Sequence, residues 1–307
     1  MGLAFLFPGQ ASQFVGMGKA LYDACDPARR LYDRANDLLG FDLKKVSFEG
    51  PEEALRQTVI TQPAVFVHSV AALEALRERG ILPSVVAGHS VGEVAALYAA
   101  GVFGFEEGLG LVAVRGRAME EAGRGRPGTM AAVIGLSEEA VAALCAETPG
   151  EVAPANFNSP EQVVISGDAE AVRAAMKLAE GRGAKRVVGL AVSGAFHTAL
   201  MAPAVEALRP TLDRTPFAPA KMPVVCNVTA APETDPGRLK ALFLKQLTNP
   251  VLWAKSVQRI AGDGGREMAE VGPGNILKGL VRRIDREVRV TCVGDPAGVE
   301  ELAKVLS

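Results

Sequence analysis

The pentapeptide Gly88-His89-Ser90-Val91-Gly92 restricts the fold of this chain more than any other segment. It lies between the apolar run Val85–Ala87 and the helical pattern Glu93–Ala100. A serine at a sharp turn from a strand into a helix has a strained backbone and an oxygen clear of the sheet. It therefore needs small neighbours, which the two glycines provide. The amides at the start of the helix would stabilise charge on a carbonyl oxygen there. The segment predicts a nucleophile elbow and acyl transfer through a serine ester.

Short apolar, β-rich runs alternate with helical patterns along much of the chain. This alternation favours a parallel α/β sheet. The sequence predicts strands at Leu3–Phe7, Val85–Ala87, Val224–Asn227 and Met268–Val271, and helices at Pro63–Arg79, Val91–Ala100 and Glu106–Ala122.

The middle of the chain follows a different order, strand-helix-strand-strand-helix-strand, which is the ferredoxin-like pattern. Its elements are Thr129–Leu136, Ser137–Glu147, Val152–Phe157, Gln162–Ser166, Asp168–Gly181 and Arg186–Val192, with a turn at Asn158–Glu161. The glycine-rich segment 123–128 is interpreted as the entrance linker, and Ser193-Gly194 as the exit.

The sequence therefore predicts an α/β fold with a parallel-sheet, α/β-hydrolase-like large domain and an inserted ferredoxin-like small subdomain. The large domain would comprise residues 1–127 and 195–307, and the small subdomain residues 128–194. A cleft between two such units is a common ligand site.

The composition is that of an ordinary globular protein, because 49% hydrophobic residues in 307 can build a sizeable core. A formal net charge of −2, from 33 basic and 35 acidic residues, argues against general nucleic-acid binding, which needs a basic excess. Neither a nucleic-acid nor a membrane partner is expected.

The cysteines and the N-terminus indicate the compartment. The four cysteines, at positions 25, 145, 226 and 292, are too scattered to predict a disulfide framework or a zinc site. The apolar N-terminus ends at Pro8-Gly9 and is too short for a signal peptide. No apolar stretch is expected to approach membrane-spanning length. The prediction is a cytoplasmic protein.

A serine nucleophile needs a base, and the chain has three histidines. His68 lies among valines in the predicted helix Pro63–Arg79, where a core or helix-face role is expected. His89 neighbours Ser90, but successive side chains near a strand end point apart, so a supporting hydrogen bond suits it better. His197 follows the last strand of the insert, where the chain returns across the cleft. It is the predicted base.

The base also needs a group that orients it. A hydrolase would have an Asp or Glu between the serine and the histidine in sequence, and Asp168 lies in that interval. It also precedes a helical Ala-Glu-Ala start, which is typical of a helix N-cap, and the cap interpretation is favoured. A serine esterase or thioesterase of the α/β-hydrolase kind, with Asp168 as the acid, remains an alternative.

Seven segments occur in order along the chain: Phe7–Gln13, Gly88–Glu93, Val114–Met119, Asn156–Pro160, Gly194–His197, Gln246–Val251 and Glu270–Gly274. Together they resemble the malonyl-CoA:acyl carrier protein transacylases of bacterial fatty-acid synthesis. The resemblance spans essentially the whole chain, and the predicted insert is similar to the small subdomain of that family.

The resemblance implies roles for individual catalytic residues. Ser90 would be the acylated nucleophile, and His197 its general base and then its general acid. The backbone carbonyl of Gln246 would orient the imidazole in place of a carboxylate. The backbone amides of Gln10 and Val91 would form the oxyanion hole.

The resemblance also implies how the acyl group is selected. Arg115 would bind the free malonyl carboxylate, because a planar guanidinium donates two parallel hydrogen bonds to two oxygens. Met119, Asn158 and His89 would contact the substrate. Phe196 would crowd an α-methyl branch, and excluding one methyl is worth about 1–3 kcal/mol. A preference for malonyl over methylmalonyl groups is therefore expected.

The implied partners are malonyl-CoA and the phosphopantetheine-bearing acyl carrier protein, a transient and acidic partner. The CoA thioester is a substrate, so no cofactor or metal is expected. The carrier would dock on a local basic patch near the cleft mouth, with candidates Lys185, Arg186, Lys255, Arg282 and Arg283. A non-catalytic carrier-docking domain is the second alternative, although such a domain could lose Ser90, His197 or Arg115, and all three are present.

Overall fold

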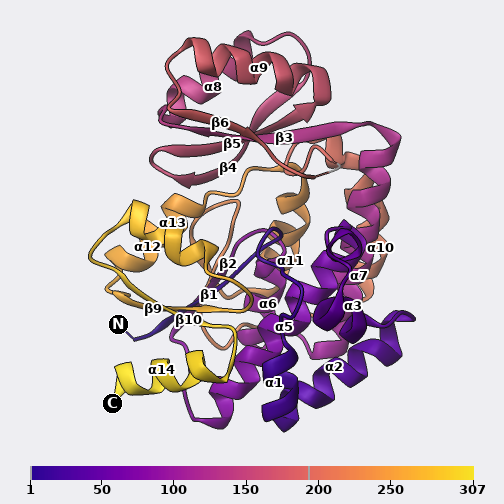
Figure 1. The fold of residues 1–307 in the computed structure, drawn as a ribbon, viewed down its shortest axis with the longest axis vertical. Coiled ribbons are helices and arrows are strands. Elements are labelled where there is room, and N and C mark those ends of the chain that lie inside the picture. The colour runs from indigo at the N-terminus through magenta and orange to yellow at the C-terminus, as the bar shows by residue number, and fades with distance from the viewer. Residues whose placement is uncertain (1, 193) are drawn as a thin grey trace.

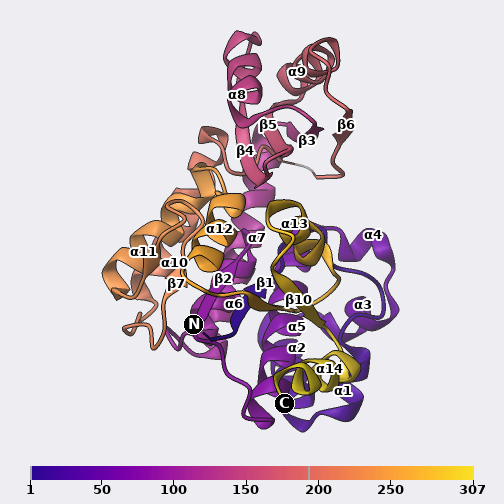
Figure 2. The ribbon, with the colours of Figure 1, turned by 90° about the vertical axis from the view of Figure 1, so that its left-hand side faces the viewer.

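The computed structural model describes residues 2–192 and 194–307. Met1 and Ser193, the latter part of the expected exit linker, lie outside the described residues. A larger α/β unit carries a smaller unit, built on an antiparallel sheet, at one end (Figure 1, Figure 2).

The strands are β1 (Ala4–Phe7), β2 (Val85–Gly88), β3 (Gly128–Ile134), β4 (Val152–Ser159), β5 (Gln162–Asp168), β6 (Arg186–Gly189), β7 (Val224–Val225), β8 (Pro232–Glu233), β9 (Glu267–Val271) and β10 (Arg289–Val293). The α-helices are α1 (Lys19–Ala24), α2 (Asp26–Leu39), α3 (Leu43–Glu49), α4 (Glu52–Leu55), α5 (Thr58–Glu78), α6 (Gly92–Ala99), α7 (Phe105–Gly125), α8 (Glu138–Glu147), α9 (Ala169–Gly181), α10 (Ala202–Arg214), α11 (Pro236–Lys245), α12 (Trp253–Gly262), α13 (Ile276–Ile284) and α14 (Pro296–Leu306). Short 3₁₀ helices span Ala199–Met201 and Gln246–Thr248.

The larger sheet has the strand order β10-β9-β1-β2-β7-β8 within the described residues. Neighbouring strands run parallel from β10 to β7, and β8 pairs antiparallel with β7 at the edge. Phe7 at the end of β1 lies opposite Gly88 at the end of β2. The segments that follow β1, β2 and β7 therefore emerge at one edge of the sheet.

Alternate residues of these strands pack on opposite faces of the sheet. Phe7 and Val86 join a core cluster with α5, α6 and α7. Leu6 and Ala87 join a second cluster with α12 and α13. Figure 2 shows the strands between these helical layers. Both faces are covered, as a parallel sheet requires.

The smaller unit contains β3, α8, β4, β5, α9 and β6 in chain order, which is the predicted ferredoxin-like order. Its sheet has the order β4-β5-β3-β6, and α8 and α9 bury their apolar residues against it. β4 contacts α12 and α13 of the larger unit. The predicted fold class is confirmed. The boundaries 1–127, 128–194 and 195–307 stay a prediction.

Three segment predictions need correction. Helix α7 continues through Gly123 to Gly125, so the predicted entrance linker is wrong in its first half. Met119 and Ala122 stay buried along that helix, and the amide of Arg126 closes its last turn on Ala122. β7 ends at Val225 rather than at Asn227, because the amide of Asn227 donates to a side chain instead of a strand. β6 ends at Gly189 rather than at Val192, because the amide of Val192 donates to the nearby carbonyl of Leu190 instead of a strand.

The expectation that no stretch approaches membrane-spanning length is wrong for α5. This helix has 21 residues, and its most apolar 18-residue window has a mean hydropathy of 1.4. By length and composition it could cross a membrane. However, 83% of that window is buried inside the structure, and α5 packs against α2, α6 and α7. A core helix passes the same test, so the finding is weak support for a membrane span.

Candidate functional site

Ser90 lies at the turn between β2 and α6 with a φ of 53°. This left-handed conformation costs a non-glycine residue about 1–3 kcal/mol. A Cβ on Gly88 would lie 2.0 Å from the carbonyl carbon of Gly92, and a Cβ on Gly92 would lie 2.2 Å from the carbonyl oxygen of Phe7. Only glycine fits such close backbone contacts. The turn has the packing expected of a nucleophile elbow.

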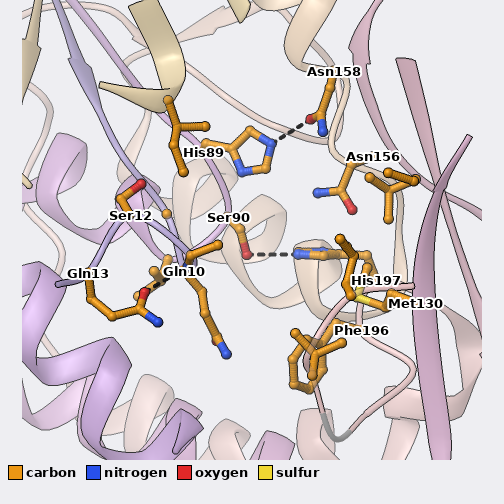
Figure 3. A pocket seen from close by; sticks show the side chains of 18 of the residues that line it. Gln10, Ser12, Gln13, His89, Ser90, Met130, Asn156, Asn158, Phe196 and His197 are labelled. Carbon is orange, nitrogen blue, oxygen red and sulfur yellow. Dashed lines mark hydrogen bonds between the residues drawn. The ribbon is translucent and has the colours of Figure 1, made fainter. Parts of the chain in front are cut away.

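His197, from the segment after β6, points at this serine. Its Nε2 lies 2.7 Å from Ser90 Oγ, and Figure 3 shows the two side chains directed toward each other. Its Nδ1–H donates to the backbone carbonyl of Gln246 at 2.8 Å. With the proton on Nδ1, Nε2 is free to accept one from the serine.

The environment of His197 keeps the imidazole neutral. Its side chain is buried, and burial together with the positive charge of Arg115 lowers its pKa to about 3. The hydrogen bond to Gln246 acts in the opposite direction. A neutral imidazole at physiological pH is the form that can act as a base.

Arg115 lies fully buried beside the same serine. Its Nη1 donates to Gln62 Oε1 at 2.9 Å, and its Nη2 donates to Gln246 Oε1 at 2.8 Å. Nη2 also lies 3.3 Å from Ser90 Oγ. Burial lowers the pKa of Arg115 to about 10, so the guanidinium is charged at neutral pH. A cation is therefore held next to the alcohol oxygen.

The amides of Gln10 and Val91 flank the elbow. A Cβ on Gly9 would lie 2.6 Å from the carbonyl oxygen of His89, so the loop after β1 packs directly on the turn. Val91 precedes the first residue of α6, where helix amides lack partners. Within residues 2–192 and 194–307, neither amide donates to a protein acceptor. Two such donors can bind an oxyanion.

The remaining predicted site residues surround this pair. His89 Nε2 lies 2.8 Å from Asn158 Oδ1 on β4 (Figure 3), so His89 has the supporting hydrogen bond expected of it. Its ring also packs edge-on against Trp253, with centroids 5.4 Å apart. Met119 and Phe196 are buried and line the same cavity.

The cavity has a volume of about 550 Å³, which suits a small-molecule site. It lies between the two units, as expected. Its lining residues come from the loop after β1, the elbow, α4, α5, α7, β3 to β5, the segment before His197 and α13. They include Gln10, Ser12, Gln13, Met130, Asn156, Gln162, Val164, Leu190, Val192, Ile276 and Leu280.

Asp168 fulfils the favoured N-cap interpretation in its position but not in its hydrogen bonds. It occupies the N-cap position of α9, as predicted, but among the described residues its side chain makes no cap hydrogen bond. Its carboxylate instead accepts from Arg126 Nε at 3.0 Å and Nη2 at 2.9 Å, because a guanidinium is a stronger donor than a backbone amide. The hydrogen bond of His197 Nδ1 goes to Gln246, and the described residues show none between His197 and Asp168.

His68 is the core histidine that the sequence indicated. It is fully buried in α5, and its Nε2–H donates to the carbonyl oxygen of Gly294 at 2.9 Å.

Three buried polar residues of the site were not predicted. Gln62 and Asn227 hydrogen-bond to Arg115 and to the amide of Ser90, respectively. Glu93 accepts from the amide of Asn227 at 2.6 Å, and burial raises the pKa of Glu93 to about 7. In the sequence, each of them is a polar residue inside or directly after an apolar run. Such a pattern does not by itself identify the hydrogen-bond partner.

Metal ligation is not supported within the described residues, where no group of three or more His, Cys, Asp and Glu could hold an ion. All four cysteines are free, and Cys25, Cys145 and Cys226 are buried.

The fold and the site together define a class of protein. A serine on an elbow, hydrogen-bonded to a histidine above a parallel α/β sheet, is the arrangement of serine acyl-transfer enzymes. The acyl transferase domain family matches residues 4–294, and the chain belongs to this family.

Individual relatives narrow this class. The chain is 42% identical over 301 residues to the malonyl CoA-acyl carrier protein transacylase of Bacillus subtilis (strain 168), covering 97% of this chain and 95% of that protein. It is similar to the acyl-carrier-protein-S-malonyltransferase of Bartonella henselae, with a TM-score of 0.96, 39% identity and coverage of 100% and 99%. A malonyl-transacylase in complex with its type II PKS acyl-carrier protein gives a TM-score of 0.95, 39% identity and coverage of 99% and 100%. The resemblance stated from the seven segments is confirmed.

Proposed function

We propose that this protein transfers the malonyl group of malonyl-CoA to the phosphopantetheine thiol of acyl carrier protein through an ester on Ser90, for fatty-acid elongation. The observation that carries the proposal is a double contact. Ser90 Oγ lies 2.7 Å from His197 Nε2 and 3.3 Å from Arg115 Nη2. One alcohol thus has both a base and a fixed cation beside it. Relatives near 40% identity carry the corresponding name.

In the first half-reaction, Ser90 Oγ attacks the thioester carbonyl while His197 Nε2 takes the serine proton. The amides of Gln10 and Val91 stabilise the oxyanion. The intermediate then expels CoA, whose thiolate receives the proton from His197. The carbonyl of Gln246 keeps the other ring proton on Nδ1 and stabilises the imidazolium.

In the second half-reaction, the carrier thiol loses its proton to His197 and attacks the serine ester. The Ser90 oxygen leaves and recovers that proton, so the enzyme returns to its starting state. CoA and malonyl-carrier are the products. This chemistry needs no resident cofactor or metal, because the CoA thioester is itself the activated substrate.

Arg115 supports a substrate with a free carboxylate. Its Nε is buried and, in the described part of the chain, donates to no protein acceptor. A malonyl carboxylate accepting from Nε and Nη2 would satisfy that donor and neutralise the buried charge. Acetyl-CoA has no group that could do so. Met119, Asn158 and His89 are proposed as further walls and contacts of the acyl site.

Phe196 is proposed to select against an α-methyl branch. The ring is buried beside His197 and lines the cavity. In F196A, the ratio of kcat/KM for methylmalonyl-CoA to kcat/KM for malonyl-CoA should rise by about 10- to 200-fold, which is the discrimination expected from one methyl group. Competition between the two thioesters measures this ratio. If the unaltered enzyme processed malonyl-CoA and methylmalonyl-CoA equally well, the selective role of Phe196 would be rejected.

The carrier is proposed to dock near α12, α13 and the small subdomain. Of the five candidates, Lys185 pairs with Glu161 and Lys255 lies 3.8 Å from Glu138. Arg186, Arg282 and Arg283 therefore offer the less compensated charge. Charge reversal of the two α13 arginines should raise KM for the carrier and flatten its salt dependence.

The reducing cytoplasm is the proposed compartment, since it suits four free cysteines.

The test separates transfer from hydrolysis. The enzyme is mixed with malonyl-CoA and holo-carrier, and malonyl-carrier is measured against free malonate. S90A should abolish both products. D168A should leave the acylation rate nearly unchanged, because it loses only a partly exposed ion pair with Arg126. A collapse of acylation in D168A, or malonate as the main product, would favour the esterase alternative.

A further inference from the structure

Asn227 lies close after β7, and its side chain contacts the turn that carries Ser90 at two points. Its Nδ2 donates to the carbonyl oxygen of Gly88 at 2.6 Å. Its Oδ1 accepts from the amide of Ser90 at 2.8 Å. β7 is the parallel neighbour of β2, so a residue just beyond the end of β7 reaches the turn just beyond β2.

The same side chain connects the serine to the group that orients the base. Gln246 Nε2 donates to Asn227 Oδ1 and to the carbonyl oxygen of Ser90, each at 3.1 Å. The backbone carbonyl of Gln246 accepts from His197. Asn227 and Gln246 are both fully buried. The backbone of Ser90 and the support of His197 therefore belong to one buried network.

This network is needed because the reacting pair is held in an unfavourable backbone conformation. Ser90 and His197 have φ values of 53° and 62°, and such conformations persist only where the surroundings over-determine them. Glu93, which is buried on α6, anchors the network by accepting from the amide of Asn227 at 2.6 Å.

We propose that Asn227, anchored by Glu93, is a positioning residue that holds the strained turn and keeps Ser90 Oγ within reach of His197 Nε2. The inference rests on the proposed function. Asn227 acts through Ser90 and Gln246 rather than on the substrate. Its loss should slow acylation while leaving the binding of malonyl-CoA, which depends on Arg115, unchanged.

The test measures the single-turnover rate of malonyl-enzyme formation by rapid mixing and intact mass. N227A should be at least tenfold slower, with KM for malonyl-CoA within twofold of the unaltered enzyme. N227D should be faster than N227A, because its carboxyl group still accepts from the amide of Ser90. Phenylmethanesulfonyl fluoride, which has no carboxylate for Arg115, should inactivate N227A more slowly by a similar factor.

L302A is the control for a general loss of stability. Leu302 is buried on α14, which packs against β10 and α5. L302A should acylate at the normal rate per folded molecule. If N227A does not accumulate, N227S serves, because its short hydroxyl cannot bridge Gly88 and Ser90, and the same slowing is expected.

Three results would overturn the inference. The first is a normal acylation rate in N227A or N227S, and the second is a loss of acylation rate in L302A equal to that in N227A when both have the same unfolding midpoint. The third is an acylation rate in N227D no faster than in N227A. Failure of the unaltered enzyme to form any adduct on Ser90 would instead reject the proposed function, and the inference with it.

Discussion

His197 and Arg115 are buried together, and each changes the chemistry of the other. Burial, and after it the positive charge of Arg115, lowers the pKa of the imidazole, and both groups lie within hydrogen-bond distance of Ser90 Oγ. A malonyl carboxylate on Arg115 would cancel that charge and make His197 a stronger base at the moment of attack. At the scale of single residues, substrate selection and base strength are therefore coupled.

The first prediction concerns pH. Acylation needs the neutral form of His197, so its rate falls as pH drops through the pKa of that group. Because this pKa is lowered from 6.5 to about 3, kcat/KM for malonyl-CoA should show no loss attributable to His197 between pH 7 and about 5. Rapid-quench rates over this range test the point. Glu93 has a pKa of about 7 and would titrate in the same range, so the profile is also measured in E93Q, which removes that titration. An inflection near pH 6.5 that persists in E93Q would contradict the account.

The second prediction concerns Arg115. R115Q should lower acylation by malonyl-CoA at least about 100-fold, since charged hydrogen bonds contribute about 1.5–3 kcal/mol each. Acetyl-CoA should lose far less, because it has no carboxylate to bind. The measurement is the ratio of the two acylation rates. R117Q, at an exposed arginine on the same helix, is the matched control and should preserve the ratio. An equal loss with both thioesters would reject the role.

At the scale of elements, the elbow depends on two glycines whose backbones touch their neighbours. G92A directs a Cβ at the Phe7 carbonyl oxygen, 2.2 Å away, and should destabilise the fold by about 2 kcal/mol or more. G110A, on the exposed side of α7 with nothing within 4 Å of the added Cβ, should be neutral or stabilising by up to about 1 kcal/mol. Urea unfolding of both variants tests this. Similar stabilities would contradict the packing argument.

Helix α5 carries its own titratable group. Burial lowers the pKa of His68 to about 4. Its folded pKa therefore lies below its unfolded value, so its contribution to stability is complete above pH 6.5 and is lost as pH falls toward 4. Relative to H68Q, whose side chain does not titrate, the unaltered protein should lose up to about 1.4 kcal/mol per pH unit in this window. Urea unfolding at pH 7, 6 and 5 measures the difference. A difference that is independent of pH would be inconsistent with a buried neutral histidine.

The elements predicted from the sequence were those with strong local patterns. The elbow, the first strand and the ferredoxin-like order follow from periodicity and glycine spacing, so local rules were enough. β10 and β8 were missed, because both lie at edges of the larger sheet and β8 has two residues. The end of α7 was misjudged because glycines in a helix interior can be tolerated where neighbouring residues pack well.

The site residues also divide into those that the sequence pattern indicates and those whose surroundings form only in the folded chain. The contact between Ser90 and His197 could be predicted, because few residues can serve as nucleophile and base. Arg115 alone would be interpreted as a solvated helix residue, and only its resemblance to a known family suggested otherwise. Its full burial depends on Gln62 from α5 and Gln246 from a distant 3₁₀ helix. Asn227 could not be assigned for the same reason, since its partners are separated from it in sequence and meet only in the folded chain.

At the scale of the whole molecule, the two units bring together residues that are far apart in the chain. The elbow serine, the arginine and the orienting carbonyl belong to the larger unit, whereas Asn158 and much of the cavity wall come from the smaller one (Figure 1, Figure 3). His197 lies on the segment that returns from the smaller unit to the larger. A cleft between two units can admit a long thioester to a reacting pair in which His197 is buried and Ser90 is half-buried.

The most direct test of the account is the intact mass of the enzyme after mixing with malonyl-CoA, and again after holo-carrier is added. The account predicts a single malonyl adduct that maps to Ser90 and then moves to the phosphopantetheine thiol, restoring the original mass. An adduct on another residue, or loss of the malonyl group to water at the same rate with and without carrier, would contradict it.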